Sequence, residues 1–372
     1  MGRCARGRVI RGWKKHEARH PPVAYVGDED LPMFVLVTGG TGYVGSHAIA
    51  ALVAAGHRVR VLARSPERVA AALVPLGIDG VESAIGDVTD PGAVERALEG
   101  CDAVLHAASV FSMDARRADE MRAVNVRGTD LVLGMAERLG LDPIVFVSSE
   151  LALLPPAEGA VLTASSPVGQ PPWPYCRSKA DSELVARQYQ ARGAPVVSVM
   201  PAAVWGPQDP HLGEGATLAA NVLKKRYPIV MRGGMHIADV RDVAAVLAAV
   251  MHPGRGPRSY LVAGQYISLP DLIRALADQS GRRIRFATLP RWFLAAFGRA
   301  ADAAQRRLNT RLPWQGEGIW VMNCAAHCDD SRTRDELGLE PRPLSETFAD
   351  TVRWLFEAGH LTPRQAGRSA AS

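Results

Sequence analysis

Short apolar runs alternate with amphipathic stretches of helical length from residue 33 to about residue 200. Continuous apolar runs are typical of strands that are buried on both faces of a sheet. They predict strands at Met33–Thr38, Arg58–Ala63, Val81–Ile85, Ala103–His106, Ile144–Ser148 and Val196–Met200. The stretches between them predict helices at Val44–Ala55, Pro66–Leu76, Ala93–Glu99, Ala115–Leu139 and Trp173–Arg192. This alternation predicts an α/β fold with a doubly wound parallel sheet and helices on both of its faces.

The regular alternation ends after Pro201. Gly, Pro and His residues interrupt the segment Trp205–Gly215, and shorter predicted elements follow it. Helices are predicted there at Ala216–Lys225, Val240–Met251, Leu269–Gln279, Arg291–Leu308 and Leu344–Glu357. We therefore expect a core domain over residues 33–205 and a smaller, mostly helical lobe over residues 206–362 that is interleaved with the core.

The two ends of the chain differ in composition from the rest. Residues 1–32 have no sustained apolar period and contain three prolines, so we expect a disordered basic tail there. The apolar run that begins at Met33 suggests that the native chain starts at this methionine, and the alternative is a targeting or binding arm. The small and polar residues 363–372 predict a frayed end, because few of them can be buried.

Composition and charge exclude several classes of protein. The 372 residues are 47% hydrophobic and 22% charged, which excludes disorder as the dominant state. The net charge is +5, but seven basic and four acidic residues stand in the first 32, so +3 of this excess belongs to the tail and no nucleic-acid partner is expected. No apolar run reaches the roughly 18–20 residues of a bilayer span, so we expect no stable membrane insertion.

The five cysteines are odd in number and too sparse for a disulfide scaffold. The N-terminus also has no apolar signal-peptide core. These two observations predict a cytoplasmic protein with reduced thiols.

The first predicted strand runs directly into a glycine-rich turn, TGGTGYVG, over residues 38–45. Gly39 permits a tight reversal, Gly42 lets a pyrophosphate approach the backbone, and Gly45 lets the following helix pack closely on the strand. The helix N-terminus offers unpaired N–H groups and a positive dipole end to phosphate. The turn therefore predicts a dinucleotide site formed by Gly39, Thr41, Gly42, Tyr43, Val44 and Gly45.

The T-G-x-x-G-x-x-G spacing and several later segments resemble the extended short-chain dehydrogenase/reductase superfamily, the NAD-dependent epimerase/dehydratase family. These segments are Gly86–Asp90, His106–Ser109, Asn125–Thr129, Pro201–Pro207 and Asp330–Gly338. The resemblance implies a Rossmann fold, with Asp87 and Val88 near the adenine and Ala107 and Ala108 along the cofactor. It also implies a homodimer, since members of this superfamily often pair through two helices.

The end of the second predicted strand bears on the choice between NADP(H) and NAD(H). NAD-preferring members carry a carboxylate there, which accepts from the ribose hydroxyls. This strand ends in Ala63-Arg64-Ser65, and a guanidinium with a neighbouring hydroxyl suits a 2′-phosphate. The layout resembles the NADPH-dependent dihydroflavonol reductase group, so NADP(H) is favoured. The alternative is that Arg64 caps the next helix or is a solvated charge.

Tyr175 and Lys179 have the Y-x-x-x-K spacing on a predicted helix, which places both side chains on one helical face. A free phenol has a pKa near 10, and a neighbouring ammonium lowers it toward values useful for proton transfer. The resemblance assigns a substrate-binding hydroxyl to Ser149, and Ser148 is the adjacent alternative. Asn125 is expected to have a structural or water-positioning role. The predicted catalytic residues are Ser149, Tyr175 and Lys179, and Lys179 is also expected to hold the nicotinamide ribose.

Weaker signals stand outside this pattern. Cys324 and Cys328 enclose His327, but the C-x-x-C spacing of a zinc site is missing, so no metal is predicted. Residues 236–242 resemble a family segment that opens a helix, with Asp239 as its cap. The arginine- and aromatic-rich stretch Arg291–Arg307 fits a lid or core helix better than a helix lying on a membrane.

These features predict an NADP-dependent oxidoreductase that transfers a hydride between nicotinamide and the carbonyl or secondary alcohol of a fairly apolar small molecule. The alternative is a nucleotide-sugar epimerase or dehydratase of the same superfamily. This chain departs from that pattern at Ala63, Met200, Leu151–Leu154 and Arg232–His236. A non-catalytic dinucleotide sensor is a third reading, but such proteins typically lack the Tyr/Lys pair.

Overall fold

The computed structural model describes residues 31–112, 115–226, 229–231, 233–289, 316–324 and 326–370. The N-terminal tail up to residue 30 and the predicted helix Arg291–Leu308 lie outside the described residues. None of the helices within the described ranges has the length and apolar content that crossing a membrane requires.

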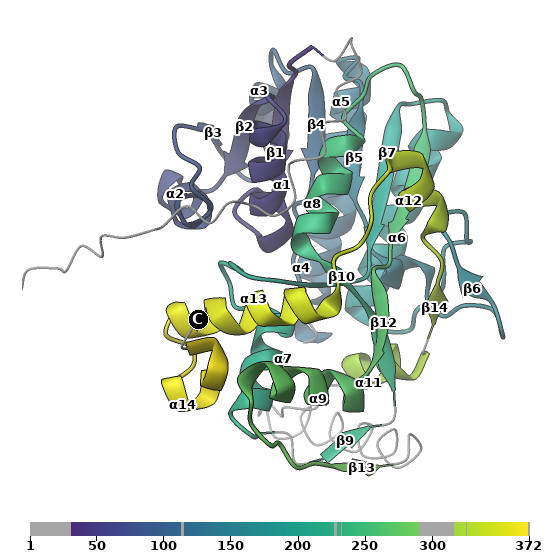
Figure 1. The fold of residues 1–372 in the computed structure, drawn as a ribbon. Coiled ribbons are helices and arrows are strands. Elements are labelled where there is room, and N and C mark those ends of the chain that lie inside the picture. The colour runs from purple at the N-terminus through teal and green to yellow at the C-terminus, as the bar shows by residue number, and fades with distance from the viewer. Residues whose placement is uncertain are drawn as a thin grey trace, which may run out of the picture. The chain divides into compact units, whose positions relative to one another are not determined.

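The apolar runs of the first 200 residues form strands of one parallel sheet. Its strands are β1 (Phe34–Thr38), β2 (Arg58–Ala63), β3 (Glu82–Ile85), β4 (Ala103–His106), β5 (Ile144–Val147), β7 (Val196–Pro201) and β11 (Arg258–Val262). They follow the order β11-β7-β5-β4-β1-β2-β3, and every neighbouring pair is parallel (Figure 1). All residues of β4, β5 and β7 are buried, which explains why these strands have no polar alternation. The structure confirms the predicted doubly wound α/β fold.

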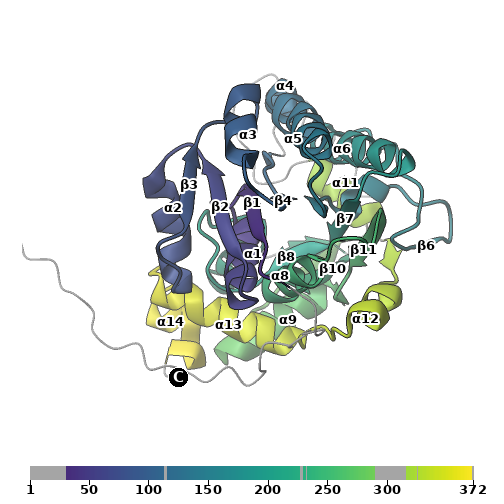
Figure 2. The ribbon, with the colours of Figure 1, turned by 90° about the horizontal axis from the view of Figure 1, so that it is seen from above.

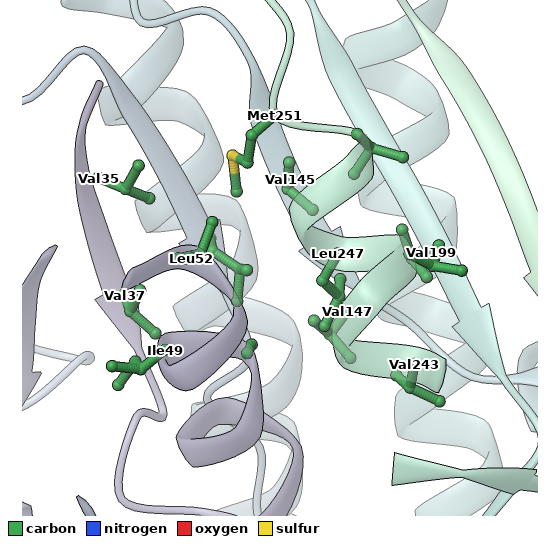
Figure 3. Close-up of a cluster of buried hydrophobic side chains, with 14 of the residues drawn as sticks. Val35, Val37, Ile49, Leu52, Val145, Val147, Val199, Val243, Leu247 and Met251 are labelled. Atoms are coloured by element: carbon green, nitrogen blue, oxygen red, sulfur yellow. The ribbon is translucent and has the colours of Figure 1, made fainter. Parts of the chain in front are cut away.

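Helices cover both faces of this sheet (Figure 2). The helices of this part are α1 (Tyr43–Ala54), α2 (Pro66–Leu73), α3 (Pro91–Leu98), α4 (Ala118–Met121), α5 (Gly128–Arg138), α6 (Pro174–Ala191) and α8 (Val240–Ala249). On one face, α1 and α8 lie side by side and bury Ile49, Leu52, Val243 and Leu247 against valines of β1, β5 and β7 (Figure 3). On the other face, α3, α5 and α6 pack on the strands around Leu36.

The predicted helix Ala115–Leu139 is helical but not uniform. It consists of a 3-10 turn (Ala115–Arg117), α4, a π-helical segment (Arg122–Arg127) and α5. Such wider turns are often found at functional sites. The π-helical segment contains Asn125, whose side chain contacts a loop and another helix, as described below.

The C-terminal part has a small sheet and a core of its own. Its elements are β8 (Ala203–Trp205), α7 (Glu214–Leu223), β9 (Ile229–Met231), β10 (Gly234–Asp239), β12 (Gln265–Ser268), α9 (Leu269–Ser280), β13 (Ala287–Leu289), α11 (Gly316–Cys324), α12 (Ser331–Leu337) and α13 (Leu344–Glu357). Strand β10 lies between β8 and β12, β9 pairs with β13, and the short strand β6 (Val161–Leu162) pairs with β14 (His327–Cys328). Trp205, Leu272 and Phe348 are central to the buried core that α7, α9 and α13 form.

Two segments of the C-terminal half belong to the main sheet and its helical layer. Strand β11 pairs with β7 at the edge of the sheet, and α8 packs beside α1. Asp239 begins α8 as its cap, accepting from the N–H of Arg241 at 2.9 Å, as the sequence predicted.

The end of the chain differs from the expectation of fraying. Residues 363–370 form α14 (Pro363–Ala366) and a 3-10 turn (Gly367–Ala370). The Thr362 side chain and Gln365 form a capping box, and Ala366 is completely buried. Small residues pack closely here, because a side chain on Gly367 would overlap the carbonyl oxygen of Ser280. Composition alone suggested a free end, whereas the helix caps and this close contact order it.

Candidate active site

The glycine-rich turn joins β1 to α1 at the carboxyl edge of the sheet. Gly39 has a φ of +73°, and a Cβ at this position would lie 2.5 Å from the backbone of both Ala107 and Ala108. A Cβ on Gly45 would overlap the carbonyl oxygen of Gly39. Glycine is therefore required at Gly39 by conformation and by space, and at Gly45 by space.

The N-terminus of α1 is open to an anion. Gly42 begins the helix without a side-chain cap, and no acidic residue stands in the first turn. The N–H groups of Tyr43, Val44 and Gly45 come before the intrahelical pattern begins, so they are free to donate to a phosphate. Thr41 lies half-buried in the turn just before them. The backbone cradle and the donor set both fit a pyrophosphate.

Gly40 belongs to the same turn and was not singled out from the sequence. A Cβ there would lie 2.6 Å from Cδ1 of Ile49 and 2.8 Å from Cγ1 of Val61. Gly40 therefore lets the turn sit on α1 and β2, a tertiary contact that the local motif does not reveal.

Side chains of α1 connect the turn to the segment that follows β8. His47 Nε2 lies 3.2 Å from the carbonyl oxygen of Pro207, and a Cβ on Gly206 would lie 3.0 Å from the Tyr43 hydroxyl. Burial lowers the pKa of His47 to about 4 and raises that of Tyr43, whose hydroxyl is buried with no hydrogen-bond partner among the described residues. Tyr43 thus contributes its backbone to the turn while its ring packs toward the C-terminal part.

The predicted adenosine contacts stand at the ends of β2 and β3. Arg64 is exposed, and it forms no hydrogen bond or ion pair with another described residue. Ser65 caps α2 by accepting from the N–H of Arg68 at 3.4 Å. Asp87 accepts from the N–H and the hydroxyl of Thr89, which together with the charge of Arg64 hold the pKa of this carboxyl below its usual range. Val88 follows it, half-buried.

Ser149 follows β5 at the same edge of the sheet. It caps the 3-10 turn Glu150–Leu153 by accepting from the N–H of Leu151 at 3.2 Å, and it is half-buried. Ser148 is 3% exposed, and its hydroxyl has no hydrogen-bond partner within the described structure. Ser149 is the more exposed of the two residues, and its hydroxyl already accepts one backbone hydrogen bond.

Tyr175 and Lys179 lie one turn apart on α6, and both are buried. The ring of Phe111 meets that of Tyr175 edge-on at 4.7 Å between centroids. Burial lowers the pKa of Lys179 to about 8, and the Glu183 carboxylate offsets part of this effect. Burial also raises the pKa of Tyr175 above its ordinary value, with Cys176 and Glu317 adding to the rise. The phenol is therefore held protonated by the protein itself, which differs from the expected lowering of its pKa by Lys179.

A series of buried, hydrogen-bonded side chains lies at this edge of the sheet, and the sequence analysis did not predict it. His106 joins Thr38 Oγ1 at 2.7 Å to Thr129 Oγ1 at 3.1 Å, and Thr129 donates to the carbonyl of Asn125. Because the Thr129 hydroxyl donates, Nε2 of His106 carries the proton. Burial and the nearby Lys179 ammonium lower the pKa of His106 to about 3, so this imidazole is neutral.

Asn125 is a structural residue of this site. Its side chain accepts from the N–H of Val110 at 2.7 Å and donates to the Val110 carbonyl at 3.0 Å. It also donates to Oγ of Ser178 at 2.9 Å. Through these bonds Asn125 joins the loop after β4, which contains Ala107 and Ala108, to α6 next to Lys179.

The cysteines near the C-terminus make ordinary contacts. Cys328 donates its N–H to His236 Nε2 at 3.1 Å and its thiol to Glu150 at 3.4 Å. Burial raises the pKa of Glu150 to about 7. Across the part of the chain that the structure describes, no three His, Cys, Asp or Glu side chains are grouped so that they could hold a metal ion.

Comparison with known proteins decides the family. The model of the NAD dependent epimerase/dehydratase family matches residues 35–263, which include the glycine turn, Ser149, Tyr175 and Lys179. The chain belongs to this family. It is thus an enzyme of the extended short-chain dehydrogenase/reductase type, which confirms the resemblance that the motifs carried.

Its relatives include reductases and sugar-nucleotide enzymes. Sterol demethylase protein B of Methylococcus capsulatus is 32% identical over 336 residues, which cover 88% of this chain and 100% of that protein. The 4-hydroxy-2-methyl-3-oxo-4-farnesyl-3,4-dihydroquinoline-1-oxide ketoreductase of Stigmatella aurantiaca is 28% identical, covering 88% and 98%. The UDP-glucose 4-epimerase of Thermus thermophilus in complex with NAD has the same fold, with a TM-score of 0.67, 25% identity, and coverage of 88% of this chain and 100% of that chain.

Proposed function

We propose that this enzyme is an NADP(H)-dependent oxidoreductase that acts on the carbonyl or secondary alcohol of a fairly apolar small molecule. The observation that carries the proposal is the set Ser149, Tyr175 and Lys179 at the edge of the sheet where the glycine turn opens. Lys179 lies close enough to His106 to lower its pKa, and His106 is hydrogen-bonded to Thr38, the last residue before the turn. The candidate proton donor and the candidate cofactor cradle therefore belong to one site.

The nicotinamide, when bound, would supply or accept the hydride. The hydroxyls of Ser149 and Tyr175 would donate to the substrate oxygen on which negative charge develops. Tyr175 would transfer its proton to that oxygen, since burial keeps the phenol protonated until a substrate needs it. Lys179 would hold the ribose hydroxyls and stabilise the phenolate that remains. Ring carbons of Phe111, which is 43% exposed, offer an apolar surface next to the phenol.

An apolar substrate is supported by the relatives and by the lining beside Tyr175. The names of two relatives refer to a sterol and to a farnesylated quinoline oxide, both large apolar ring compounds. The segment after Ser149 does not add to this support, because Leu153 and Leu154 are buried in a core cluster. Their apolar character therefore serves packing, and Phe111 is the described side chain with surface beside the phenol.

The substrate class is tested with purified protein, NADPH and a panel of alicyclic and aromatic ketones, followed at 340 nm. We expect turnover with members of this panel and no interconversion of UDP-glucose and UDP-galactose. Tyr175→Phe keeps the packing ring and removes the proton, so it should retain NADPH binding and lose most turnover. Epimerisation of the UDP-sugar without net cofactor consumption would instead identify the enzyme as the alternative, and full activity of Tyr175→Phe would remove the proposed reaction centre.

The preference for NADP(H) rests on Arg64. This guanidinium is exposed and forms no hydrogen bond or ion pair with another described residue, although its charge acts on the Asp87 carboxyl, and Ala63 supplies no carboxylate to repel a phosphate. A charge-assisted contact contributes about 1.5–3 kcal/mol, so NADPH should bind roughly ten- to a hundredfold more tightly than NADH.

The matched test measures dissociation constants of both cofactors at one fixed salt concentration. The double variant Ala63→Asp/Arg64→Asn should narrow or reverse the preference. Arg68→Asn, a change of a neighbouring exposed arginine on α2, should leave it within about twofold. Equal affinities of the wild type for the two cofactors would contradict this assignment.

A further inference from the structure

The first turn of α6 is buried, and its backbone donors need a partner. The helix starts after Trp173, which provides no side-chain cap, and Pro174 occupies the first position. The N–H groups of Tyr175 and Cys176 then precede the intrahelical pattern. Tyr175 and Cys176 are 8% and 0% exposed, so water cannot readily satisfy these groups.

The partner is Glu317, from α11, 141 residues later in the chain. The N–H of Cys176 donates to Glu317 Oε1 at 2.8 Å, and the backbone amide of Tyr175 helps to hold the pKa of this carboxyl down against the larger effect of burial, which raises it. Glu317 is only 2% exposed. Its carboxylate thus caps the helix that carries Tyr175 and Lys179.

Burial of the Glu317 carboxylate costs free energy of folding. Glu317 forms no ion pair with any Lys or Arg of the described residues, and an unpaired buried carboxylate is normally destabilising. The positive end of α6 and the backbone donors offset part of the cost. A Ser or Asp at position 173 would cap the helix locally at lower cost.

We propose that Glu317 is a positioning residue for the reaction at Tyr175, an inference that rests on the proposed function. Its carboxylate fixes the first turn of α6, and with it the position of the phenol relative to Ser149. An error of about 1 Å in such a position can cost a hundredfold in rate. The same carboxylate opposes formation of the phenolate, so it keeps the phenol protonated before reduction, and the Lys179 ammonium must offset its charge when the proton leaves. Among the described residues, Cys176 on its own helix and Glu317 on α11 add to the rise that burial causes in the pKa of the phenol, and the Lys179 ammonium lies one turn further along α6.

The test uses the full chain, NADPH and the ketone of the panel that is turned over fastest. Glu317→Ala removes the cap and should lower kcat at least tenfold, with the Kd for NADPH within about twofold of the wild type because the phosphate donors stand between β1 and α1 and not on α6. Glu317→Gln keeps an oxygen acceptor and should restore kcat to within about threefold.

Asp330 offers a matched control, since its carboxylate also accepts from two backbone N–H groups, those of Ala263 at 2.9 Å and Gly264 at 3.1 Å. Asp330→Ala should lose stability but keep the kcat of the folded enzyme. The proposal is overturned if kcat of Glu317→Ala equals that of the wild type. It is also overturned if the loss of kcat is proportional to the loss of stability across Glu317→Ala, Glu317→Gln and Asp330→Ala. If Glu317→Ala does not fold, Glu317→Asp takes its place, because it keeps the charge but shortens the side chain that caps the helix. A kcat of Glu317→Asp equal to that of the wild type overturns the proposal equally. Full activity of Tyr175→Phe would be a failure of the proposed function instead.

Discussion

Lys179 is an ammonium held almost entirely away from water, with 6% of its surface exposed. Charged groups resist such burial, and the consequence here is a pKa lowered to about 8. The Y-x-x-x-K spacing in the sequence predicted which residues share a helical face. It carried no information on burial, which depends on packing around α6, or on Glu317, which comes from a distant segment.

Replacement of Lys179 should therefore separate stability from activity. Because the folded state disfavours the ammonium, Lys179→Met should increase the free energy of unfolding by roughly 1–3 kcal/mol at pH 7 while most activity is lost. The unfolded chain keeps its ordinary pKa near 10.4, so the gain is full below pH 8 and disappears as the pH rises through about 10.4. Urea unfolding of the cofactor-free protein at several pH values measures this. Lys225→Met, at an exposed lysine, should change stability by less than about 0.5 kcal/mol.

Among the elements, the glycine turn shows how far a motif predicts structure. The roles of Gly39, Gly42 and Gly45 could be expected from their spacing between a strand and a helix. The need for Gly40 could not, because it comes from Ile49 and Val61 on two neighbouring elements. The local sequence predicts the local geometry of the turn, but it does not predict the contacts between elements.

A methyl group added to this turn should block the cofactor site. The Cβ of Gly45→Ala would overlap the carbonyl oxygen of Gly39, so the turn must move and the phosphate donors with it. We expect NADPH affinity to fall at least a hundredfold in an equilibrium titration. Gly92→Ala in the first turn of α3, where the nearest atom is the flexible end of Arg96 at 3.2 Å, should bind NADPH normally. Normal binding by Gly45→Ala would contradict this account of the turn.

The cap of α8 also joins this helix to α13. Asp239 accepts from Arg241 and from the hydroxyl of Thr347 at 2.7 Å, and Arg241 donates to Asp350. Asp239→Asn should lower the free energy of unfolding by about 1–3 kcal/mol, because the half-buried guanidinium of Arg241 loses one of its two carboxylate partners. Asp271→Asn, in the first turn of α9 where Asp271 forms an exposed ion pair with Arg274, should cost less than about 1 kcal/mol by the same thermal or urea measurement.

At the scale of the whole molecule, the sequence predicted the first six strands of the main sheet and the helices between them. It did not predict β11, or the small sheet of β8, β10 and β12, because no continuous apolar run marks these strands. Their partners come from remote segments, so no local period marks them. The packing of α8 beside α1 is likewise a property of the folded chain.

Buried histidines should make the whole molecule sensitive to acid. Burial lowers the pKa of His47 to about 4 and that of His106 to about 3, while both are near 6.5 in the unfolded chain. Between these values the unfolded state binds more protons, so the free energy of unfolding should fall as the pH drops below 6.5. Each group contributes about 1.4 kcal/mol per pH unit there. Urea unfolding at pH 7, 5.5 and 4.5 should show a shallower slope for His106→Gln than for the wild type, and equal slopes would refute the assignment.

The position of β11 and α8 has a consequence during synthesis. Strand β7 ends at Pro201, but the strand that pairs with its open edge ends only at Val262, about 60 residues later. A chain made at roughly 5–20 residues per second needs about 3–12 s to cover that distance. During this interval the nascent protein presents an unpaired strand edge and the uncovered apolar side of α1 to the cell. Ribosomes that stop between the codons for Pro201 and Val262 would release products prone to aggregate. The yield of this enzyme should therefore depend on steady translation of this segment and on chaperones that bind the incomplete chain.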